Sequence, residues 1–390
     1  MGWPSRRERP WALGGLDEPA EVVRAEDGTV STRARLVDEL AALVGCESGS
    51  TDLAALETCA GLVDDVGAGW VGRSAERHMV EGRTHLRWRF GATRVLLLGH
   101  YDTVWPTGTL AGWPFAVDGD RATGPGIFDM KAGIIQLFAA LGDRDDLDGV
   151  SVLLTADEEL GSPSSRSLIE DTARDAEAAL VLEPSAGGAL KLARKGVSLY
   201  TVRTLGRAAH AGLEPERGVN AGLELAHQLI AIAGLGRAEV GTTVTPTVLA
   251  GGTTSNTVPA AATVAVDVRA TSEGEQQRVD SALRALAPVL TGAGVEVSGG
   301  PNRPPLEANA SSALFALAGE VAHALGMGPL EGVAVGGGSD GNFTAGLGVP
   351  TLDGLGAVGD HAHAEGEWVS VDAMVARSAL VGELVARLLR

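Results

Sequence analysis

The sequence has few basic residues, few cysteines and no long apolar run, and each shortage excludes a class of protein. Only 31 Lys and Arg oppose 50 Asp and Glu, which gives a net charge of −19. No basic surface is left to neutralise a phosphate backbone, so we expect no nucleic-acid partner. The two cysteines, Cys46 and Cys59, have no further Cys or His at metal-like spacing. They therefore indicate two buried thiols rather than a disulfide framework.

We expect neither membrane insertion nor secretion, on similar grounds. No stretch approaches the ~18 consecutive apolar residues of a membrane span, and the N-terminal MGWPSRRERPWALGG lacks the apolar core of a secretory signal. We expect a soluble, cytoplasmic protein that does not bind membranes. The chain has 390 residues, of which 45% are hydrophobic. Because single cores stop growing at roughly 250–300 residues, we expect two domains.

The chain is predicted to fall into four segments. The first, residues 1–30, lacks periodicity and forms a loose extension. The second, residues 31–191, alternates apolar strands with helical stretches, which indicates a parallel sheet covered on both faces. Its clearest elements are helices at 32–45 and 132–142 and strands at 95–99, 150–155 and 178–183.

The third segment, residues 192–304, changes character. Its pattern runs strand, helix, strand, strand, helix, strand, which is the ferredoxin-like order with an antiparallel sheet. The α/β pattern resumes in residues 305–390, so we expect this last segment to complete the first domain. The predicted fold class is α/β: a catalytic domain with a mixed or parallel sheet and an inserted ferredoxin-like α+β lid.

Histidine and acidic residues stand at the ends of the apolar strands. In an open α/β sheet the carboxyl ends of the strands line the ligand crevice, so side chains far apart in sequence can converge there. Asp129 stands at the mouth of a helix and can join them, as can a histidine after a later strand. The residues concerned are His100, Asp102, Asp129, Asp157, Glu158, Glu159, Glu183 and His363.

Two histidines and several carboxylates without a cysteine ligand suit zinc, cobalt or manganese. A shared carboxylate can hold two ions ~3.5–4 Å apart, and we expect two zinc ions. Glu158 and Glu159 are adjacent, so their side chains diverge, and one can ligate metal while the other accepts a proton from water. Asp102, two residues after His100, is placed to receive the second imidazole N–H and fix the ring.

Seven segments resemble successive motifs of the M20 metallopeptidase family, in order, over about residues 33–390. They are GHYDTVWP, TGPGIFDMKAG, DEELGSPSSR, VLEPS, GRAAHAGLEPERGVNA, SNTVPAAATVAVDVR and GDHAHAEGEWV. The GSPSSR run, the Glu at position 183 and the PNRPP run at 301–305 are most similar to the glutamate carboxypeptidases. The N-terminal extension has no counterpart in this resemblance.

The resemblance implies a role for each residue of the site. Asp129 would bridge two metal ions and would be followed by a cis peptide bond to Met130. Glu158 would be the general base. The other ligands would form two pairs, His100 with Glu183 and Glu159 with His363.

The resemblance also assigns residues outside the strand ends. His210 in GRAAHAG matches a histidine that reaches the partner subunit's site to stabilise the oxyanion, which implies a homodimer through the lid. Asn256 and Arg269 resemble a substrate-facing pair, although Arg269 could instead form a plain strand salt bridge. Arg303 resembles the clamp for a terminal carboxylate, a task suited to the planar guanidinium.

Two local alternatives concern other residues. His361 and His363 are each followed four residues later by Glu, and we prefer His363 because Glu367 and the two residues after it resemble the family's acidic, aromatic and aliphatic sequence. The segment 337–341 fits GxSxG, which would make Ser339 the nucleophile of a serine hydrolase. That hypothesis gives the strand-end acids no role, so we read the glycines as a turn near the substrate.

The sequence thus predicts a two-zinc hydrolase that cuts an amide bond beside a free carboxylate and releases an amino acid such as glutamate. Its substrate is expected to be a small peptide or N-acyl amino acid. Other members of the family, such as aminoacylases, dipeptidases or N-carbamoyl amino acid hydrolases, could share the metal centre, because a fold does not fix specificity. A metal-binding scaffold without activity is the remaining alternative.

Overall fold

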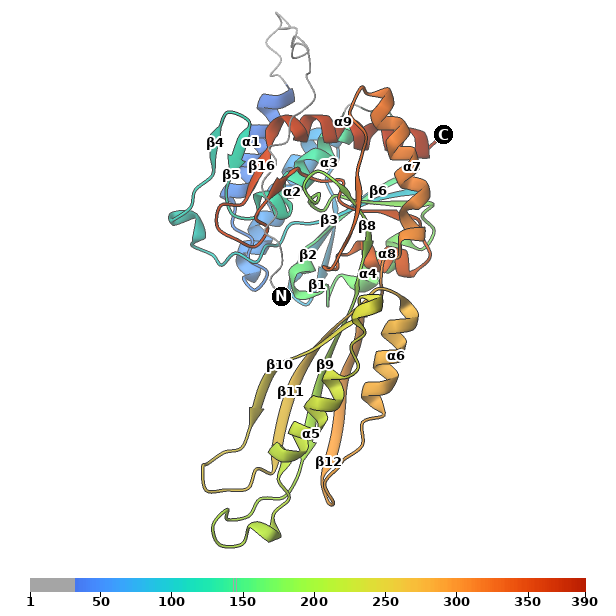
Figure 1. Ribbon diagram of the computed structural model, residues 1–390. Helices are drawn as coiled ribbons and strands as arrows, with labels where there is room; N and C mark the ends of the chain where they lie inside the picture. Colours follow the sequence, from blue (N-terminus) through green and yellow to red (C-terminus); the bar gives the residue numbers. More distant parts are fainter. Residues whose placement is uncertain (1–31, 143, 145) are drawn as a thin grey trace, which may run out of the picture.

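The computed structural model describes residues 32–142, 144 and 146–390, so the predicted extension at 1–30 lies outside the described residues. Figure 1 shows two parts, a broad main domain and a narrow lid that projects from it. The main domain comprises residues 32–195 and 304–390, and the lid comprises residues 196–303. Among the described residues, none of the helices combines the length and apolarity needed to cross a membrane.

The main domain is built on a six-stranded mixed sheet in the order β1-β2-β6-β3-β7-β14. Strands β6, β3, β7 and β14 run parallel, and the hairpin β1-β2 adds an antiparallel edge. This agrees with the predicted mixed or parallel sheet, although the hairpin itself was not predicted, because the segment ERHMVEGRTHLRWRF contains several charged residues instead of forming an apolar run. The strands are β1 (Glu76–Val80), β2 (Arg83–Phe90), β3 (Val95–His100), β6 (Val150–Thr155), β7 (Ala178–Val181) and β14 (Thr351–Leu352).

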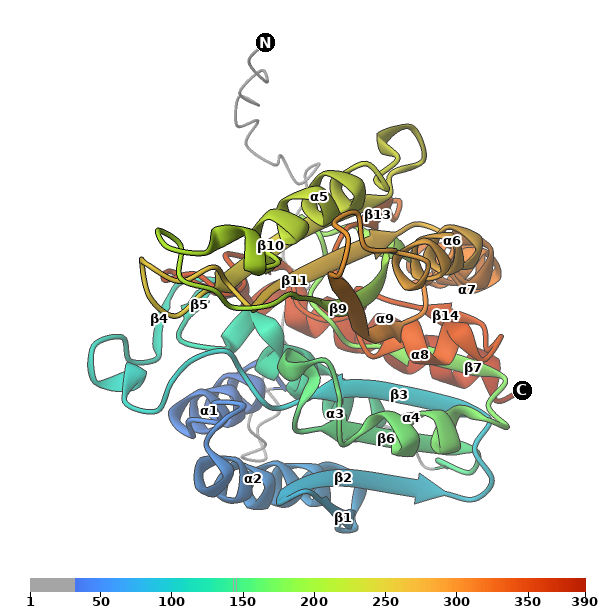
Figure 2. The same cartoon turned by 90° about the horizontal axis from the view of Figure 1, so that it is seen from below.

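Helices cover both faces of this sheet, as predicted, and Figure 2 shows the arrangement from below. Successive residues of β3 point to opposite faces: Leu97 joins the larger core cluster, whereas Leu96 and Leu98 join a smaller one. The larger cluster contains α1 (Thr32–Gly45), α2 (Leu53–Val71), α3 (Ala132–Gly142), α7 (Ala308–Ala324) and α9 (Val371–Leu388). The smaller cluster contains α4 (Arg166–Ala173) and α8 (Gly341–Gly346).

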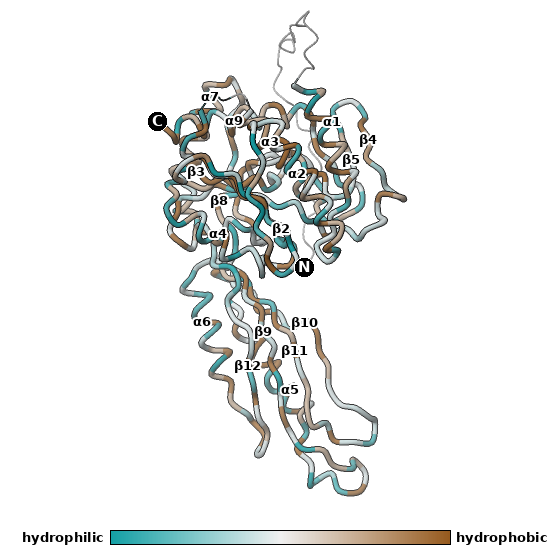
Figure 3. Tube along the Cα trace, turned by 180° about the vertical axis from the view of Figure 1, so that it is seen from behind, coloured by the Kyte–Doolittle hydropathy of each residue, from teal (hydrophilic) through white to brown (hydrophobic). Residues whose placement is uncertain are grey.

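The lid is a four-stranded antiparallel sheet in the order β10-β11-β9-β12, with two helices and a core cluster of its own. The predicted ferredoxin-like order is confirmed. Hydrophobic residues recur along α5 and β10 (Figure 3). The elements are β9 (Gly196–Leu205), α5 (Ala221–Ala233), β10 (Thr243–Gly251), β11 (Ala261–Ala270), α6 (Glu273–Arg284) and β12 (Gly294–Arg303).

The strand register fixes which lid loops lie far from the main domain. Gly196, at the junction with the main domain, pairs with Ala270, whereas Leu205 pairs with Ala261 at the other end of the sheet. At about 3.3 Å per residue, β9 carries the chain roughly 30 Å outward. The loops 206–220 and 252–260 therefore lie at the distal end of the lid.

Short elements complete the main domain. Strands β8 (Leu190–Arg194) and β13 (Gly332–Val335) form a parallel pair, and β4 (Ala116–Asp118), β5 (Arg121–Thr123), β16 (Trp368–Ser370) and β15 (Gly359–Asp360) form a small sheet. Single helical turns occur at Thr109–Ala111, Ile127–Lys131, Glu158–Leu160, Pro215–Arg217 and Ala238–Val240. Both cysteines are free thiols; Cys59 is buried as predicted, whereas Cys46 is partly exposed.

Candidate metal centre

The side chains predicted at strand ends converge at the carboxyl edge of the main sheet. His100 is the last residue of β3, and Glu158 and Glu159 form the turn after β6. Glu183 follows β7, and Asp129 lies in the turn that leads into α3. His363 comes from the loop between β15 and β16. Five segments of the main domain thus contribute to one site.

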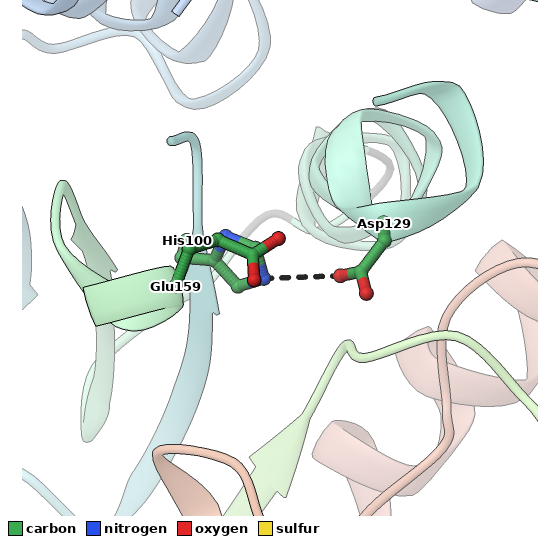
Figure 4. A group of neighbouring side chains, drawn as sticks. All are labelled: His100, Asp129 and Glu159. Carbon is green, nitrogen blue, oxygen red and sulfur yellow. Dashed lines mark hydrogen bonds and ion pairs between the residues drawn. The ribbon is translucent and has the colours of Figure 1, made fainter. Parts of the chain in front are cut away.

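Asp129 lies at the centre of this cluster, with one oxygen facing each histidine. Its Oδ1 lies 3.1 Å from Nε2 of His100, and its Oδ2 lies 3.3 Å from Nε2 of His363. Glu183 Oε1 lies 3.4 Å from the first imidazole, and Glu159 Oε1 lies 3.1 Å from the second. Glu183 therefore lies beside His100, and Glu159 lies beside His363, in the absence of any metal. Figure 4 shows His100 of β3 and Glu159 turned toward Asp129.

The cluster has the donor set and the charge to hold divalent ions. His100, Asp129 and Glu159 each place a ligand atom within 4.8 Å of the others, and so do His100, Glu158 and Glu183. Hydrogen bonds with Asp129 and Glu159 raise the pKa of His363 to about 10, because these carboxylates stabilise the protonated imidazole. Nitrogen and oxygen donors without thiolate suit zinc, cobalt or manganese. The residues present fit two such ions.

Asp102 forms hydrogen bonds both with His100 and with the turn after β6. Nδ1 of His100 lies 2.9 Å from the backbone oxygen of Asp102 and 3.4 Å from its Oδ1, so the carbonyl is the nearer partner. The sequence argument assigned this contact to Asp102 without naming the atom. The carboxylate instead accepts hydrogen bonds from the backbone N–H groups of Glu158 and Glu159 and from the hydroxyl of Ser50. The fully buried Asp102 thus keeps Nε2 of His100 directed toward Asp129 and Glu183.

The turn that carries Asp129 is held by a residue whose role the sequence did not reveal. A cis peptide bond joins Asp129 to Met130, as the resemblance implied. The buried carboxylate of Glu367 accepts hydrogen bonds from the backbone N–H groups of Gly126, Phe128 and Asp129. It also accepts one from the indole N–H of a tryptophan, Trp105. Glu367 was noted only as part of a motif, and nothing in its spacing predicts these partners.

Glu158 is buried against Arg303. Its Oε1 lies 2.9 Å from Nη2 of Arg303, and Arg303 also bonds to Asp340 and Ser162. Burial raises the pKa of Glu158 well above its ordinary value, and the guanidinium opposes this only in part. A carboxylate with a raised pKa is suited to accept and return a proton near neutral pH. Arg303 itself is almost completely buried.

Three further predicted residues lie away from this cluster. His210 and Asn256 are neighbours in the distal loops of the lid, where the N–H of Ala211 bonds to the backbone oxygen of Asn256. Arg269 lies at the other end of the lid sheet, opposite Val197, which also pairs with Arg303. Its guanidinium forms a bidentate ion pair with Asp267, the salt bridge that the sequence left open.

The serine-hydrolase alternative finds no support in the geometry of Ser339. This serine is fully buried, and its hydroxyl donates to Asp353 at 2.6 Å. Among the described residues, no histidine forms a hydrogen bond with it. The glycines of the motif approach protein side chains, since a Cβ on Gly338 would lie 3.1 Å from Arg303 and one on Gly341 would lie 2.8 Å from Val181. Close approach of these glycines to a substrate stays a prediction.

The sequence argument preferred His363 to His361 as the site residue, and the contacts of the two histidines agree with this preference. His363 contacts Asp129 and Glu159. His361 is exposed, and within the described part of the chain it forms no ion pair with the cluster. The loop 360–366 therefore presents one of its two histidines to the site.

The chain is similar in sequence and in fold to known proteins. Residues 96–387 match the model of peptidase family M20/M25/M40. The chain is 33% identical to carboxypeptidase G2 from Pseudomonas sp. (strain RS-16) over 311 residues, which cover 76% of this chain and 74% of that protein. A tripeptidase structure from Staphylococcus aureus superposes with a TM-score of 0.72 at 20% identity, covering 91% of this chain and 98% of that one. A dinuclear metal-binding M20 peptidase from Bacillus subtilis gives 0.61 at 16% identity, covering 92% and 98%.

Proposed function

The chain belongs to peptidase family M20/M25/M40 and is a metallohydrolase, and from this premise we propose that it is a two-zinc carboxypeptidase. It would hydrolyse an amide bond beside a free carboxylate and release an amino acid such as glutamate. The likeness to carboxypeptidase G2 supports this activity. The observation that carries it is the contact between Glu158 and Arg303, which puts a proton acceptor beside a group that binds carboxylates.

In this proposal Asp129 would be shared by both ions. His100 and Glu183 would hold one ion, and Glu159 and His363 would hold the other. The proposal rests on the distances from each Asp129 oxygen to a different imidazole. Two zinc ions bound there supply Lewis acidity that polarises the amide carbonyl. Cobalt or manganese could replace zinc with the same donor set.

The chain's own residues would then move the proton. Glu158 takes a proton from the attacking water and returns it to the leaving nitrogen, which its burial and raised pKa favour. In the described conformation Arg303 is paired with Glu158. A substrate carboxylate that binds Arg303 would replace Glu158 as its partner and so free the base. Asp102 would keep His100 oriented through the contacts described above.

The lid would complete the site in a homodimer. His210 and Asn256 lie roughly 30 Å from the junction of their own lid, as the length of β9 requires. In this proposal these two would serve the metal centre of a second copy, with His210 at the oxyanion and Asn256 at the substrate. Arg269, at the junction end of the lid, would face the substrate bound to its own chain. An exposed apolar surface supports this contact: Leu223 and Ile230 lie on one face of α5, and Val248 and Leu249 lie on the edge strand β10.

A substrate panel tests the activity. The protein is stripped with a chelator, titrated with zinc and assayed on N-acyl glutamate, aspartate, alanine and leucine, each paired with its carboxamide analogue. We expect activity to return near two zincs per chain. The carboxamides should be cleaved far more slowly, because loss of one partner of a buried charge pair costs about 2–5 kcal/mol.

Each other outcome revises the proposal in a defined way. Equal cleavage of acids and carboxamides would remove the role of Arg303 and favour another amidohydrolase of the family. A preference for alanine or leucine would contradict release of glutamate. Two bound zincs with no hydrolysis of any member would favour a scaffold without activity.

A further inference from the structure

The segment that fits GxSxG, residues 337–341, contacts a buried arginine from another strand. The sequence argument did not consider this arginine. Arg194, in β8, forms five hydrogen bonds, as many as a guanidinium has N–H groups. Nη1 donates to the backbone oxygens of Gly337 and Gly338. Nε and Nη2 donate to the two oxygens of Asp353 at 2.7 and 3.0 Å. The remaining bond, from Nη2, goes to Oε2 of Glu183 at 2.8 Å.

A continuous chain of contacts therefore links the motif to a proposed metal ligand. Ser339 donates to Asp353, Asp353 pairs with Arg194, and Arg194 pairs with Glu183. All four residues are at most 6% exposed. Because every N–H of the guanidinium is used and water is excluded, Arg194 has no alternative orientation at comparable energy.

The contact between Arg194 and Glu183 makes the two proposed glutamate ligands, Glu183 and Glu159, differ in how many oxygens they can offer to a metal. Oε2 of Glu183 is occupied by Arg194, with Nζ of Lys191 3.8 Å away, and only Oε1 faces His100. Glu159 faces His363, and within the described residues no Lys or Arg forms an ion pair with it. Glu159 can turn either oxygen to a metal, whereas Glu183 can offer one.

We propose that Arg194 is a positioning residue that restricts Glu183 to a single ligand oxygen. The inference rests on the proposed two-metal function. A carboxylate that binds through one oxygen occupies one coordination position, and a catalytic ion needs a position left open for substrate. Ser339, Asp353 and the backbone oxygens of Gly337 and Gly338 serve this arrangement, which gives the motif a role without a nucleophile.

The test uses cobalt as the probe, because its visible absorption reports coordination number. The wild-type protein is stripped and titrated with cobalt; two bound ions per chain are required by the proposed function, and fewer would contradict that function rather than this inference. With Arg194→Lys, Glu183 can offer both oxygens. We expect the absorption of one of the two ions to weaken as its coordination number rises, while two ions still bind.

Two further variants separate orientation from charge and from misfolding. Asp353→Asn touches neither proposed ion but loosens Arg194, so it should change the spectrum in the same direction. Lys191→Met removes the neighbouring charge without altering the hydrogen bonds of Arg194, so it should leave the spectrum unchanged. In the zinc enzyme, we expect kcat to fall roughly 10–100-fold for Arg194→Lys with little change in KM.

The inference is overturned if both Arg194→Lys and Asp353→Asn retain the wild-type cobalt spectrum. It is also overturned if Lys191→Met changes the spectrum as much as Arg194→Lys does, because charge alone would then explain the effect. Should Arg194→Lys fail to fold, Asp353→Asn decides the question by the same spectrum. Loss of all activity in Ser339→Ala with an unchanged spectrum would contradict the structural role of this serine.

Discussion

Glu158 and Glu159 are neighbours in the sequence, yet their side chains meet different partners. Glu158 pairs with Arg303, whereas Glu159 pairs with His363. The argument from adjacency predicted this divergence, because successive residues of a turn cannot aim their side chains at one point. The two carboxylates should therefore respond differently to the same substitution.

Glu158→Gln should lower kcat by roughly 10²–10⁴-fold, the usual contribution of a general base. Zinc content should stay at two per chain, measured by elemental analysis of the same preparation. Glu159→Gln is the matched control and should reduce bound zinc as well as activity. Wild-type turnover by the Glu158→Gln protein would exclude the proposed base.

The acid side of the pH profile should also report on Glu158. A base works when it is deprotonated, and burial raises the pKa of Glu158 above its ordinary value of 4.5. As the pH falls, kcat/KM should therefore decline at a higher pH than an exposed glutamate would allow. The measurement is kcat/KM against pH, with zinc content followed in parallel. A flat profile down to pH 4.5 with zinc retained would contradict this expectation.

At the level of elements, the turn 126–131 depends on an acid from the far end of the chain. Glu367 precedes β16 and accepts three backbone N–H groups of this turn. A glutamine offers one oxygen, so two of the donors that now reach the carboxylate would lose their acceptor. Each buried N–H left unpaired costs about 1–3 kcal/mol.

Glu367→Gln should therefore weaken zinc binding roughly 10–100-fold, as loss of a contact behind a ligand commonly does. Competition with a chromophoric chelator measures the affinity. Glu365→Gln is the control, because it removes the same charge from an exposed residue two positions earlier. Equal affinities in the two variants would show that the Glu367 contacts do not hold the turn.

The elements that sequence reasoning found and missed differ in physical character. Strands β3, β6 and β7 are continuous apolar runs, so the positions of His100, Glu158 and Glu183 at their ends could be predicted. The hairpin β1-β2 was missed because its exposed face carries charged residues. Arg194 and Asp353 are 159 residues apart, and no local pattern predicts such a pair. Residue types at strand ends were enough to predict the central cluster of side chains. The contacts that support this cluster could be seen only in the folded structure.

At the level of the whole molecule, the lid separates His210 from the metal centre of its own chain. If the partner supplies His210, two inactive variants should complement each other. Glu158→Gln lacks the base, and His210→Ala lacks the distal histidine. In a mixed dimer, one site has an intact Glu158 and receives an intact His210 from the other chain.

Mixing the two variants in equal amounts should restore up to about one quarter of wild-type activity, since half of random dimers are mixed and each has one intact site. Subunit exchange is followed by light scattering and activity together. Ile230→Glu, which places a charge on the exposed face of α5, should abolish both dimer and rescue. A mixture that exchanges subunits but stays inactive would exclude action of His210 across the dimer.

The insertion of the lid between Glu183 and His363 also sets the order in which the residues of the site are synthesised. During synthesis the ribosome makes His100, Asp129, Glu159 and Glu183 first, then the whole lid, and only afterwards His363 and Glu367. A nascent chain stalled within the lid thus carries His100 but not His363 of the proposed site, and the turn that bears Asp129 still lacks its buried acceptor. We expect such a chain to bind no more than one zinc ion, so that loading of the second follows translation of the lid.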